Sequence, residues 1–517
     1  MHARGQALAE RLVRRYSENA GEQGGESGFV MVFVALMLTV MLVFAAFTID
    51  FGSWYTRSAE LKRAADAAAL AGVVWMPELD QAQQYALATA AKNGFVNGVN
   101  NIQVTVSDIP NNNRQLKVTI TDTKAKQYFS RLVTQNQSIS RSSVAEYIMP
   151  VPLGSPKNTF GTGNLLSSPD TENFWAAVSG YCSGHESGDK ALSGFESYST
   201  SGSGCNNGSP ANSDDYDPTG YLYAVDLPAA TTSLKLDVYD AEYNQNNTSD
   251  NELVNNQTVN TTYQIYDRNP TPLDLSNLTL LSTVNVPTNS ATYANQWKNL
   301  YTWTNPKAGQ YYIRVLTAAT DTTNSRGSNG FSLRAYTGAS FATCTTITGS
   351  ANYSSTCPQV HAVSDMSIYA NATGTSASFY LAQIDAVNAG KTMRINLFDP
   401  GEGASTLQIL DPNGNPATFS WSTPCNPPTP PSGSCSGSGI SSLDVSGTGT
   451  QPYTGMNGNS KYNDRYLTID IPLPANYSTV YSGKVWWKVK YTTSASSVTD
   501  RTTWSVNIVG DPVHLLQ

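Results

Sequence analysis

Residues Phe29 to Ile49 read FVMVFVALMLTVMLVFAAFTI, an uncharged apolar run of 21 residues. At about 1.5 Å per helical residue, such a run reaches about 30 Å, the thickness of one bilayer hydrocarbon core. Nothing else in the 517 residues resembles it. The run therefore predicts one transmembrane helix, residues 29–49, between a short tail, residues 1–28, and a long polar body.

A secretory signal peptide is the alternative interpretation of this run. Signal h-regions are usually about 7–15 residues long and end at a small-residue cleavage site. This run is longer and continues into Asp50-Phe51-Gly52. We therefore expect a retained anchor and keep a cleaved signal as the alternative. A buried core helix is disfavoured, because a helix that is apolar on all sides has little to pack against in so polar a chain.

The cations that flank the run predict its orientation. Four precede it and three follow it closely: Arg4, Arg11, Arg14 and Arg15, then Arg57, Lys62 and Arg63. The positive-inside rule favours a cytoplasmic N-terminus by a narrow margin. We expect a single-pass protein whose C-terminal body is extracytoplasmic.

The cysteines agree with an exported body, since all six follow the run: Cys182, Cys205, Cys344, Cys357, Cys425 and Cys435. An even number on one side of a membrane indicates disulfides in an oxidising compartment. Sequential pairing (182–205, 344–357, 425–435) closes the shortest loops and is the expected arrangement. Six unrelated free thiols are the alternative.

Composition narrows the function classes. Charged residues make up 14% of the chain, the net charge is −8 and the pI is near 5.1. These values argue against nucleic-acid binding, which needs a basic footprint. The chain has no G-x-S-x-G elbow, H-E-x-x-H motif or phosphate-binding glycine loop. Cys182 lies near His185 and Glu186, but we interpret this cluster as a disulfide-tethered loop rather than a thiol nucleophile, and we expect no enzyme activity and no cofactor.

The segment after the run predicts a small α+β unit over residues 50–150. Tyr55 to Val74 reads YTRSAELKRAADAAALAGVV, which is rich in strong helix formers, so one helix should extend from Phe29 to about Gly72. A second helix, Leu79 to Lys92, should stop at Asn93-Gly94. Alternating residues then predict strands at 102–107, 116–121 and 138–148, with a short helix around Lys126 to Val133.

These residues carry a family resemblance. The apolar span, an acidic residue with glycine, a polar helix and an Ala-rich motif follow in the order seen in TadE/TadG-like proteins of Tad (Flp) pilus assembly. The residues concerned are Gly28, Asp50, Gly52, Ala65, Asp66, Ala67, Ala68 and Gly72. The chain resembles that family over about residues 25–150. The resemblance implies a pilin-like unit, a bacterial cytoplasmic membrane location, and other Tad pilus-assembly proteins or pilins as partners.

The chain departs from the family in two places. Pilin-like relatives cleaved by prepilin peptidase carry Glu five residues after the cleaved glycine, and Phe33 stands there in this chain. Cleavage between Gly28 and Phe29 is therefore left open. Many TadG-like proteins also carry a von Willebrand factor A domain with a metal-binding Asp-x-Ser-x-Ser string. The nearest string, Asp444 to Thr448, lies in a Ser/Gly-rich segment that we interpret as a loop.

An internal repeat organises the rest of the chain. Tyr221 to Asp226 is followed by Leu234 to Asp240, and Tyr380 to Asp385 is followed by Met393 to Asp399. Further matching segments follow in the same order, starting at 262 and 406 and at 309 and 483. The period-2 alternation and Asn/Gly/Pro turns predict two tandem antiparallel β-sandwich, jelly-roll-like domains, residues 155–340 and 345–517. The fold class is mainly β with an N-terminal transmembrane helix.

Aspartates at the predicted strand ends have two interpretations. Asp commonly caps turns, and its carboxylate also suits Ca²⁺. We favour turn capping because no EF-hand or nonapeptide spacing is present, and keep Ca²⁺ as a weak alternative. The candidate ligands are Asp214, Asp215, Asp217, Asp240 and Asp399.

Two function hypotheses follow, with one remote alternative. The first is a non-catalytic, membrane-anchored component of Tad/Flp-type pilus assembly or surface adhesion. The second is a surface adhesin or carbohydrate-binding protein that uses the tandem sandwiches to bind surface glycans. In that case Trp297, Trp303, Trp486 and Trp487 would stack on sugars, but aromatic residues at alternate strand positions usually fill a core, and we favour that interpretation. The remote alternative is an accessory protein of a secreted hydrolase.

Overall fold

A computed structural model describes most of the chain. The described residues are 3–76, 79–109, 112–130, 137–147, 150–162, 174–184, 188–194, 216–241, 259–270, 275, 278–287, 290–317, 327–342, 357–373, 375–401, 404–424, 435–446, 461–462, 465–493, 497–509 and 513–516. The chain divides into two compact units, residues 1–148 with 512–517 and residues 149–511. We refer to them as the N-terminal unit and the β-rich unit, and each is described separately.

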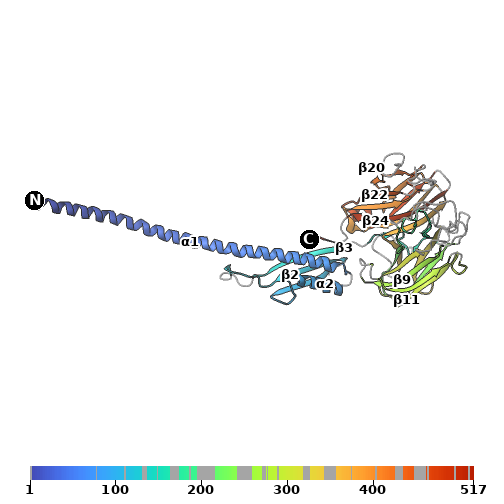
Figure 1. The fold of residues 1–517 in the computed structure, drawn as a ribbon, viewed down its shortest axis with the longest axis horizontal. Coiled ribbons are helices and arrows are strands. Elements are labelled where there is room, and N and C mark those ends of the chain that lie inside the picture. Colours follow the sequence, from blue (N-terminus) through green and yellow to red (C-terminus); the bar gives the residue numbers. More distant parts are fainter. Residues whose placement is uncertain are drawn as a thin grey trace. The chain divides into compact units, whose positions relative to one another are not determined.

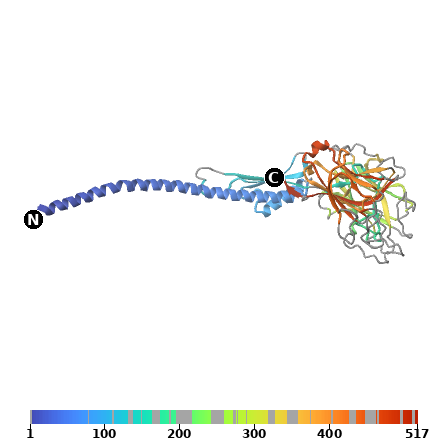
Figure 2. The ribbon, with the colours of Figure 1, turned by 90° about the horizontal axis from the view of Figure 1, so that it is seen from above.

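Two helices lead the N-terminal unit. The first, α1 (Ala3–Val73), is one unbroken helix that contains the apolar run (Figure 1). It ends beside Gly72, as predicted, but begins well before Phe29, so part of the predicted tail is also helical. The second, α2 (Leu79–Lys92), has the predicted bounds. Figure 2 shows how far α1 extends beyond the small sheet, which lies along the C-terminal end of this helix.

The apolar run has no protein neighbour within the described residues. Side chains along it are exposed, for example Phe29 at 74% and Phe44 at 69%. Among those residues, α1 is the one helix long and apolar enough to cross a membrane, with a mean hydropathy of 2.8 over an 18-residue stretch. Exposing so much apolar surface to water is unfavourable, and this favours lipid as its environment.

The sheet of the N-terminal unit has four antiparallel strands in the order β1-β2-β3-β25. Their bounds are β1 Ile102–Ile109, β2 Asn112–Asp122, β3 Ile139–Tyr147 and β25 Val513–Leu515. The first three lie where alternation predicts strands. The predicted short helix at Lys126 to Val133 is wrong over residues 126–129, because residues 126 and 127 have no regular structure and residues 128 and 129 form a bend.

The strand β25 was not predicted. Val513 pairs with Tyr147 of β3, whereas the sequence places the end of the chain in the second sandwich. The β-rich unit is therefore inserted in the chain between two neighbouring strands of the N-terminal sheet. A three-residue strand offers too little pattern to be assigned to one sheet or another.

The β-rich unit contains two large sheets, together with the short helices η3 (Ala386–Asn388) and α3 (Tyr477–Tyr481). One has ten strands in the order β10-β9-β12-β7-β14-β4-β16-β23-β18-β21. Their bounds are β4 Pro152–Leu153, β7 Tyr221–Leu227, β9 Thr261–Asn269, β10 Leu280–Val286, β12 Gly309–Thr317, β14 Gln359–Val363, β16 Ser376–Gln383, β18 Thr406–Leu410, β21 Leu443–Asp444 and β23 Trp486–Thr492.

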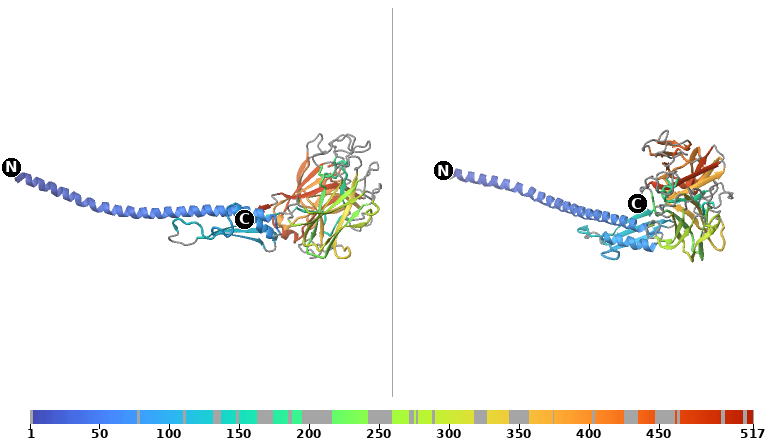
Figure 3. Two further views of the ribbon diagram at one scale, coloured as in Figure 1. Left: turned by 60° about the horizontal axis from the view of Figure 1, so that its bottom comes forward. Right: turned by 45° about the vertical axis from the view of Figure 1, so that its right-hand side comes forward.

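The other sheet has eleven strands in the order β11-β8-β13-β6-β15-β24-β17-β22-β19-β20, with β5 on β13. Their bounds are β5 Thr159–Phe160, β6 Phe174–Ser179, β8 Ser233–Asp240, β11 Trp297–Thr304, β13 Ser328–Thr337, β15 Asp365–Thr373, β17 Thr392–Phe398, β19 Phe419–Ser422, β20 Ser436–Ile440, β22 Tyr466–Pro472 and β24 Ser497–Val509. The buried faces of both sheets share one hydrophobic core, and the strands of this unit are drawn from green to red in Figure 3.

Strands that the sequence pairs as repeat copies occupy equivalent places. In the first sheet, β9-β12-β7 and β18-β23-β16 lie in reversed order on the two sides of β14-β4. In the second sheet, β8-β13-β6 and β17-β24-β15 also lie in reversed order, with β6 and β15 adjacent at the boundary between them. This order is the one that an approximate two-fold axis between the copies produces.

The two copies also share both sheets. The strand β14 pairs with β7 of the first copy, and β4 pairs with β16 of the second. The strands β6 and β15 pair across the same boundary. Residues 155–340 and 345–517 therefore contribute to one continuous pair of sheets, with residues 513–515 outside it.

Three groups of the β-rich unit, the buried His361 and Asp240 and the half-buried Asp365, have raised pKa values. Burial alone would lower the pKa of His361, but Asp226, whose Oδ2 lies 3.0 Å from Nε2, raises it above its ordinary value. Burial raises the pKa of Asp240 to about 7, although a hydrogen bond from Asn329 opposes this. Burial, with the charges of Asp217 and Asp189, raises the pKa of Asp365 to about 6.

We predict that the β-rich unit is more stable at about pH 5 than at about pH 8. Each raised pKa means that the folded state keeps a proton which the unfolded chain releases at lower pH, so the free energy of unfolding falls as pH rises through this window. Thermal unfolding of the full chain in detergent at a series of pH values measures this. Asp240→Asn should flatten the dependence, and a midpoint that rises with pH would contradict the prediction.

Candidate functional site

The candidate site is the region where α1 leaves the apolar run and meets the N-terminal sheet. Asp50, the first residue beyond Ile49, is fully buried. Its Oδ1 accepts a hydrogen bond from the backbone N–H of Tyr128 at 2.8 Å, and its Oδ2 accepts from the N–H groups of Phe129 at 2.9 Å and Ser130 at 2.5 Å. One carboxylate thus binds three successive backbone donors of a loop 78 residues away along the chain.

These hydrogen bonds explain why the predicted helix at 126–133 does not form over residues 126–129. The N–H groups of residues 128–130 point to the carboxylate of Asp50 rather than to preceding carbonyl groups. Burial alone would raise the pKa of Asp50, but the backbone donors from Ser130, Tyr128 and Phe129 outweigh it and lower the pKa to about 2. The carboxylate is therefore charged throughout the physiological range, which strengthens its hydrogen bonds.

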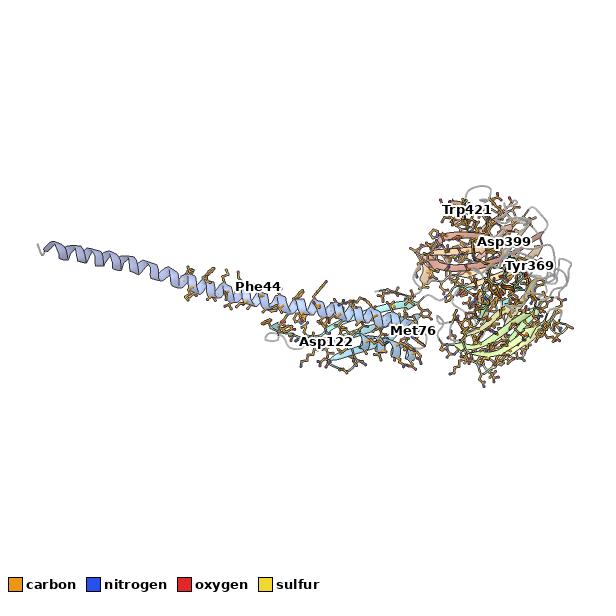
Figure 4. All side chains as sticks on the ribbon, in the orientation of Figure 1. Phe44, Met76, Asp122, Tyr369, Asp399 and Trp421 are labelled. Carbon is orange, nitrogen blue, oxygen red and sulfur yellow. The ribbon has the colours of Figure 1, made fainter. Side chains whose placement is uncertain are left out.

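A second carboxylate holds the other end of the same loop. Asp122 is buried at the end of β2, and its Oδ2 accepts from Arg57 Nε at 2.9 Å. Its Oδ1 accepts from the backbone N–H of Lys124 at 3.2 Å. Arg57 also contacts Glu60 at 3.3 Å. Figure 4 shows Asp122 on the sheet beside α1, and Phe44 on the bare part of the helix.

The Ala-rich motif forms the contact face of α1. Ala65 and Ala68 are fully buried, and the helix packs on β2, β3 and α2. The buried side chains of α2 are also alanines. Small side chains let the backbones approach closely. Asp66 lies at the edge of this face and pairs with Lys62 at 2.9 Å, and Ala67 is half-buried beside it.

Two of the three signature glycines, Gly72 and Gly52, differ in their surroundings. A Cβ on Gly72 would lie 2.6 Å from Leu116 Cδ2 and 2.8 Å from the carbonyl oxygen of Ala82, so glycine is required for this approach. A Cβ on Gly52 would meet nothing within 4 Å. Gly28 lies within α1, so the sites that the sequence singles out fall on one helix.

Sequence reasoning missed the loop that these residues hold. Tyr128 and Phe129 are exposed at 47% and 46%, and Lys126 Nζ lies 4.8 Å from the Tyr128 ring centre. The sequence feature that could have indicated this loop is the mixture of aromatic and cationic residues in Lys126 to Phe129. We interpreted that segment as a helix. Its partner Asp50 was identified, but only through the family resemblance.

The structure does not bring the Ca²⁺ candidates together. Asp240 accepts from Asn329 Nδ2 at 3.2 Å, and Asp399 is buried after β17, with four strands between β8 and β17 in the sheet order. Asp217 accepts from the N–H of Thr219, as a turn cap does. Asp214 and Asp215 lie outside the described residues. Within the described part of the chain, no three His, Cys, Asp or Glu side chains are placed to hold a metal ion.

Other predicted positions have plain structural roles. Asp444 Oδ1 accepts from the N–H and hydroxyl of Ser446, as expected for a loop. Cys182, Cys357 and Cys435 are not free thiols. Cys205, Cys344, Cys425, His185 and Glu186 lie outside the described residues, so the disulfide pairing stays a prediction.

The tryptophans considered for sugar stacking are mostly in the core. Trp303, Trp486 and Trp487 are 4%, 7% and 1% exposed, which confirms the favoured core interpretation and excludes sugar stacking for these three. Trp297 is half-buried, and the guanidinium carbon Cζ of Arg334 lies over its ring, 4.4 Å from the ring centre. A hollow of about 520 Å³ lies elsewhere, on the second copy, and is lined by Asn396, Ser422, Thr423, Pro424, Tyr466, Thr468 and Ser505.

We predict opposite effects of alanine at the two signature glycines. Gly72→Ala should destabilise the N-terminal unit by about 1–3 kcal/mol, because the added methyl group overpacks the contact with Leu116 and Ala82. Gly52→Ala, the matched control, should be neutral or stabilising by up to about 1 kcal/mol, since alanine favours helix. Thermal unfolding in detergent, followed by helical circular dichroism, measures both. Equal effects of the two substitutions would contradict this packing.

The chain was compared with solved structures, which match it only weakly. Solved structures matched over most of this chain include the tandem CBM22-1–CBM22-2 domain of Paenibacillus barcinonensis Xyn10C, at 9% identity, a TM-score of 0.14, and coverage of 80% of this chain and 92% of that one. Tripeptidyl peptidase 2 matches at 8% identity and a TM-score of 0.18, covering 78% of this chain and 37% of that one. Scores this low carry no argument about fold or function.

No curated protein matches the chain. The model of the Tad family, described as Flp pilus-assembly TadE/G-like, matches residues 28–84. That segment contains the end of the predicted tail, the apolar run, Asp50 and the Ala-rich contact face up to Gly72. The N-terminal segment of this chain is therefore a TadE/G-like segment of the Tad (Flp pilus-assembly) family.

Proposed function

We propose that the protein is a membrane-anchored, extracytoplasmic and non-catalytic component of Tad/Flp-type pilus assembly or surface adhesion in a bacterial envelope. The match at residues 28–84 carries this proposal. Its support in the structure is that the matched residues join the apolar helix to a folded unit, through the Asp50 hydrogen bonds and the buried alanines. Other Tad assembly proteins or pilins are the proposed partners.

The continuous helix suits such a role. Because α1 runs without a break from the apolar run to Val73, the N-terminal sheet packs on the continuation of the helix that forms the membrane anchor. Three cysteines of the β-rich unit that are not free thiols agree with the proposed oxidising compartment.

We predict that Asp50→Ala in the native host abolishes piliation and adhesion while the protein is still made. Three backbone donors would lose their acceptor, and the loop would detach from α1. Asp66→Ala is the matched control, because its surface ion pair with Lys62 contributes little. Pili are counted by electron microscopy, and sheared and membrane fractions are blotted for the protein.

We expect full-length protein in the membrane fraction. Recovery with sheared filaments, shortened at its N-terminus, would instead make it a processed filament subunit. Deleting the gene without any change in pili or adhesion would overturn the proposed function.

Binding of a neutral surface glycan by the β-rich unit is a second candidate function. Among the described residues, the hollow on the second copy is lined by hydroxyl and amide side chains with Pro424 and Tyr466, and none of these lining residues is charged. Lys190 Nζ lies 3.9 Å from the centre of the Tyr466 ring, over one of its faces. In the first copy, Asp237 and Arg334 form an ion pair at 2.9 Å on the corresponding strands β8 and β13. Hydroxyl and amide groups with an aromatic face suit a sugar.

We predict that the full chain in detergent binds a glycan array, and that Asn396→Ala combined with Thr468→Ala weakens binding at least tenfold. The exposed Thr283→Ala on β10 is the control and should bind as the wild type does. An array on which the wild type binds nothing would rule out this candidate without affecting the pilus proposal.

A further inference from the structure

The loop Lys126 to Ser130 is held at the level of α1 where the apolar run ends. Asp50, which binds the N–H groups of Tyr128 and Phe129, follows Ile49 directly. One turn further along the helix, Trp54 Nε1 donates a hydrogen bond to the carbonyl oxygen of Lys126 at 3.3 Å. The loop therefore lies against residues 50–54 of α1.

This level corresponds to the lipid headgroup layer if the apolar run fills the hydrocarbon core. A bilayer of about 40–45 Å with a core of about 30 Å leaves about 5–7 Å of headgroup region on each side. At about 1.5 Å per residue, that region covers about three to five residues of an upright helix. Residues 50–54, and with them the loop, fall inside it.

The side chains exposed at this level are those that favour a membrane interface. Phe51 and Tyr55 on α1 are 71% and 76% exposed, and Tyr128 and Phe129 on the loop are 47% and 46% exposed. Four exposed aromatic side chains around one helix turn are unfavourable in water. Aromatic residues gather at headgroup level because they combine an apolar ring with polar or polarisable edges.

Cations accompany these rings. Lys124 and Lys126 are both exposed and line a hollow of about 490 Å³ together with Gly52 and Trp54. Arg57, in the same hollow, is already engaged by Asp122 and Glu60. Within this hollow, the two lysines are therefore the cations available to lipid phosphates, and the exposed Arg141 lines a neighbouring hollow with Phe51 and Tyr55. Juxtamembrane lysines are attracted to anionic headgroups by about 1 kcal/mol each.

We propose that the loop Lys126 to Ser130 is a second membrane contact, which places Tyr128 and Phe129 in the headgroup layer and Lys124 and Lys126 against lipid phosphates. The inference rests on the membrane anchor of the proposed function and adds to it a contact made by a different segment. A helix alone leaves the N-terminal unit able to rotate about the helix axis. The loop contact fixes which side of that unit faces the bilayer.

Site-specific photocrosslinking of the full chain tests this contact. The photoreactive residue p-benzoylphenylalanine replaces Phe129, and the protein is reconstituted in vesicles of phosphatidylethanolamine and phosphatidylglycerol. Lipid adducts are measured by mass spectrometry after illumination. The same residue at Tyr85 of α2, 42% exposed, is the matched control away from the apolar run, and at Phe44 within the run it is the positive control.

We expect adducts at Phe44 and Phe129 and several-fold fewer at Tyr85. Adducts at Phe44 with Phe129 no higher than Tyr85 would overturn the loop contact and leave the anchor intact. Absence of adducts at Phe44 would overturn the anchor itself, and with it both the inference and the membrane part of the proposed function. Lys124→Gln with Lys126→Gln should lower the adduct yield at Phe129 in these vesicles, but not at Phe44.

Discussion

The carboxylate of Asp50 determines where the folded N-terminal unit begins relative to the membrane anchor. It is a buried charge at the point where an apolar helix becomes amphipathic, and three backbone N–H groups of a distant loop satisfy it. A buried carboxylate without donors would be costly. The loop must therefore stay at this turn of the helix, and the strands on its two sides, β2 and β3, are positioned on α1 by the same constraint.

The rest of the N-terminal unit follows from close backbone approach. Alanines on α1 and α2 leave room for the sheet, and Gly72 allows contact with Leu116 and with the backbone of Ala82. The Ala-rich motif is thus a packing surface, with Asp66 as an exposed exception. A family motif that looks like a functional signature is accounted for here by the requirements of joining a membrane helix to a small sheet.

In the β-rich unit, the main constraint is that the exposed strand edges of the two repeat copies must be covered. Each copy on its own would expose strand edges at β7 and β16, and these are covered by β14 and β4 from the opposite copy. The aromatic side chains that a sugar-binding hypothesis required are used instead to fill the core between the sheets, as Trp487 does by donating to the Tyr477 hydroxyl at 2.8 Å.

The sequence by itself determined the elements whose pattern is local. The length of the apolar run, the bounds of α2 and the alternation in β1, β2 and β9 could be predicted because burial of one face leaves a periodic trace in neighbouring residues. Only the tertiary structure decided which loop Asp50 binds, that β25 pairs with β3, and that the two copies share their sheets. Those choices depend on backbone hydrogen bonds between distant segments, and since every residue carries the same backbone groups, residue type alone does not specify them.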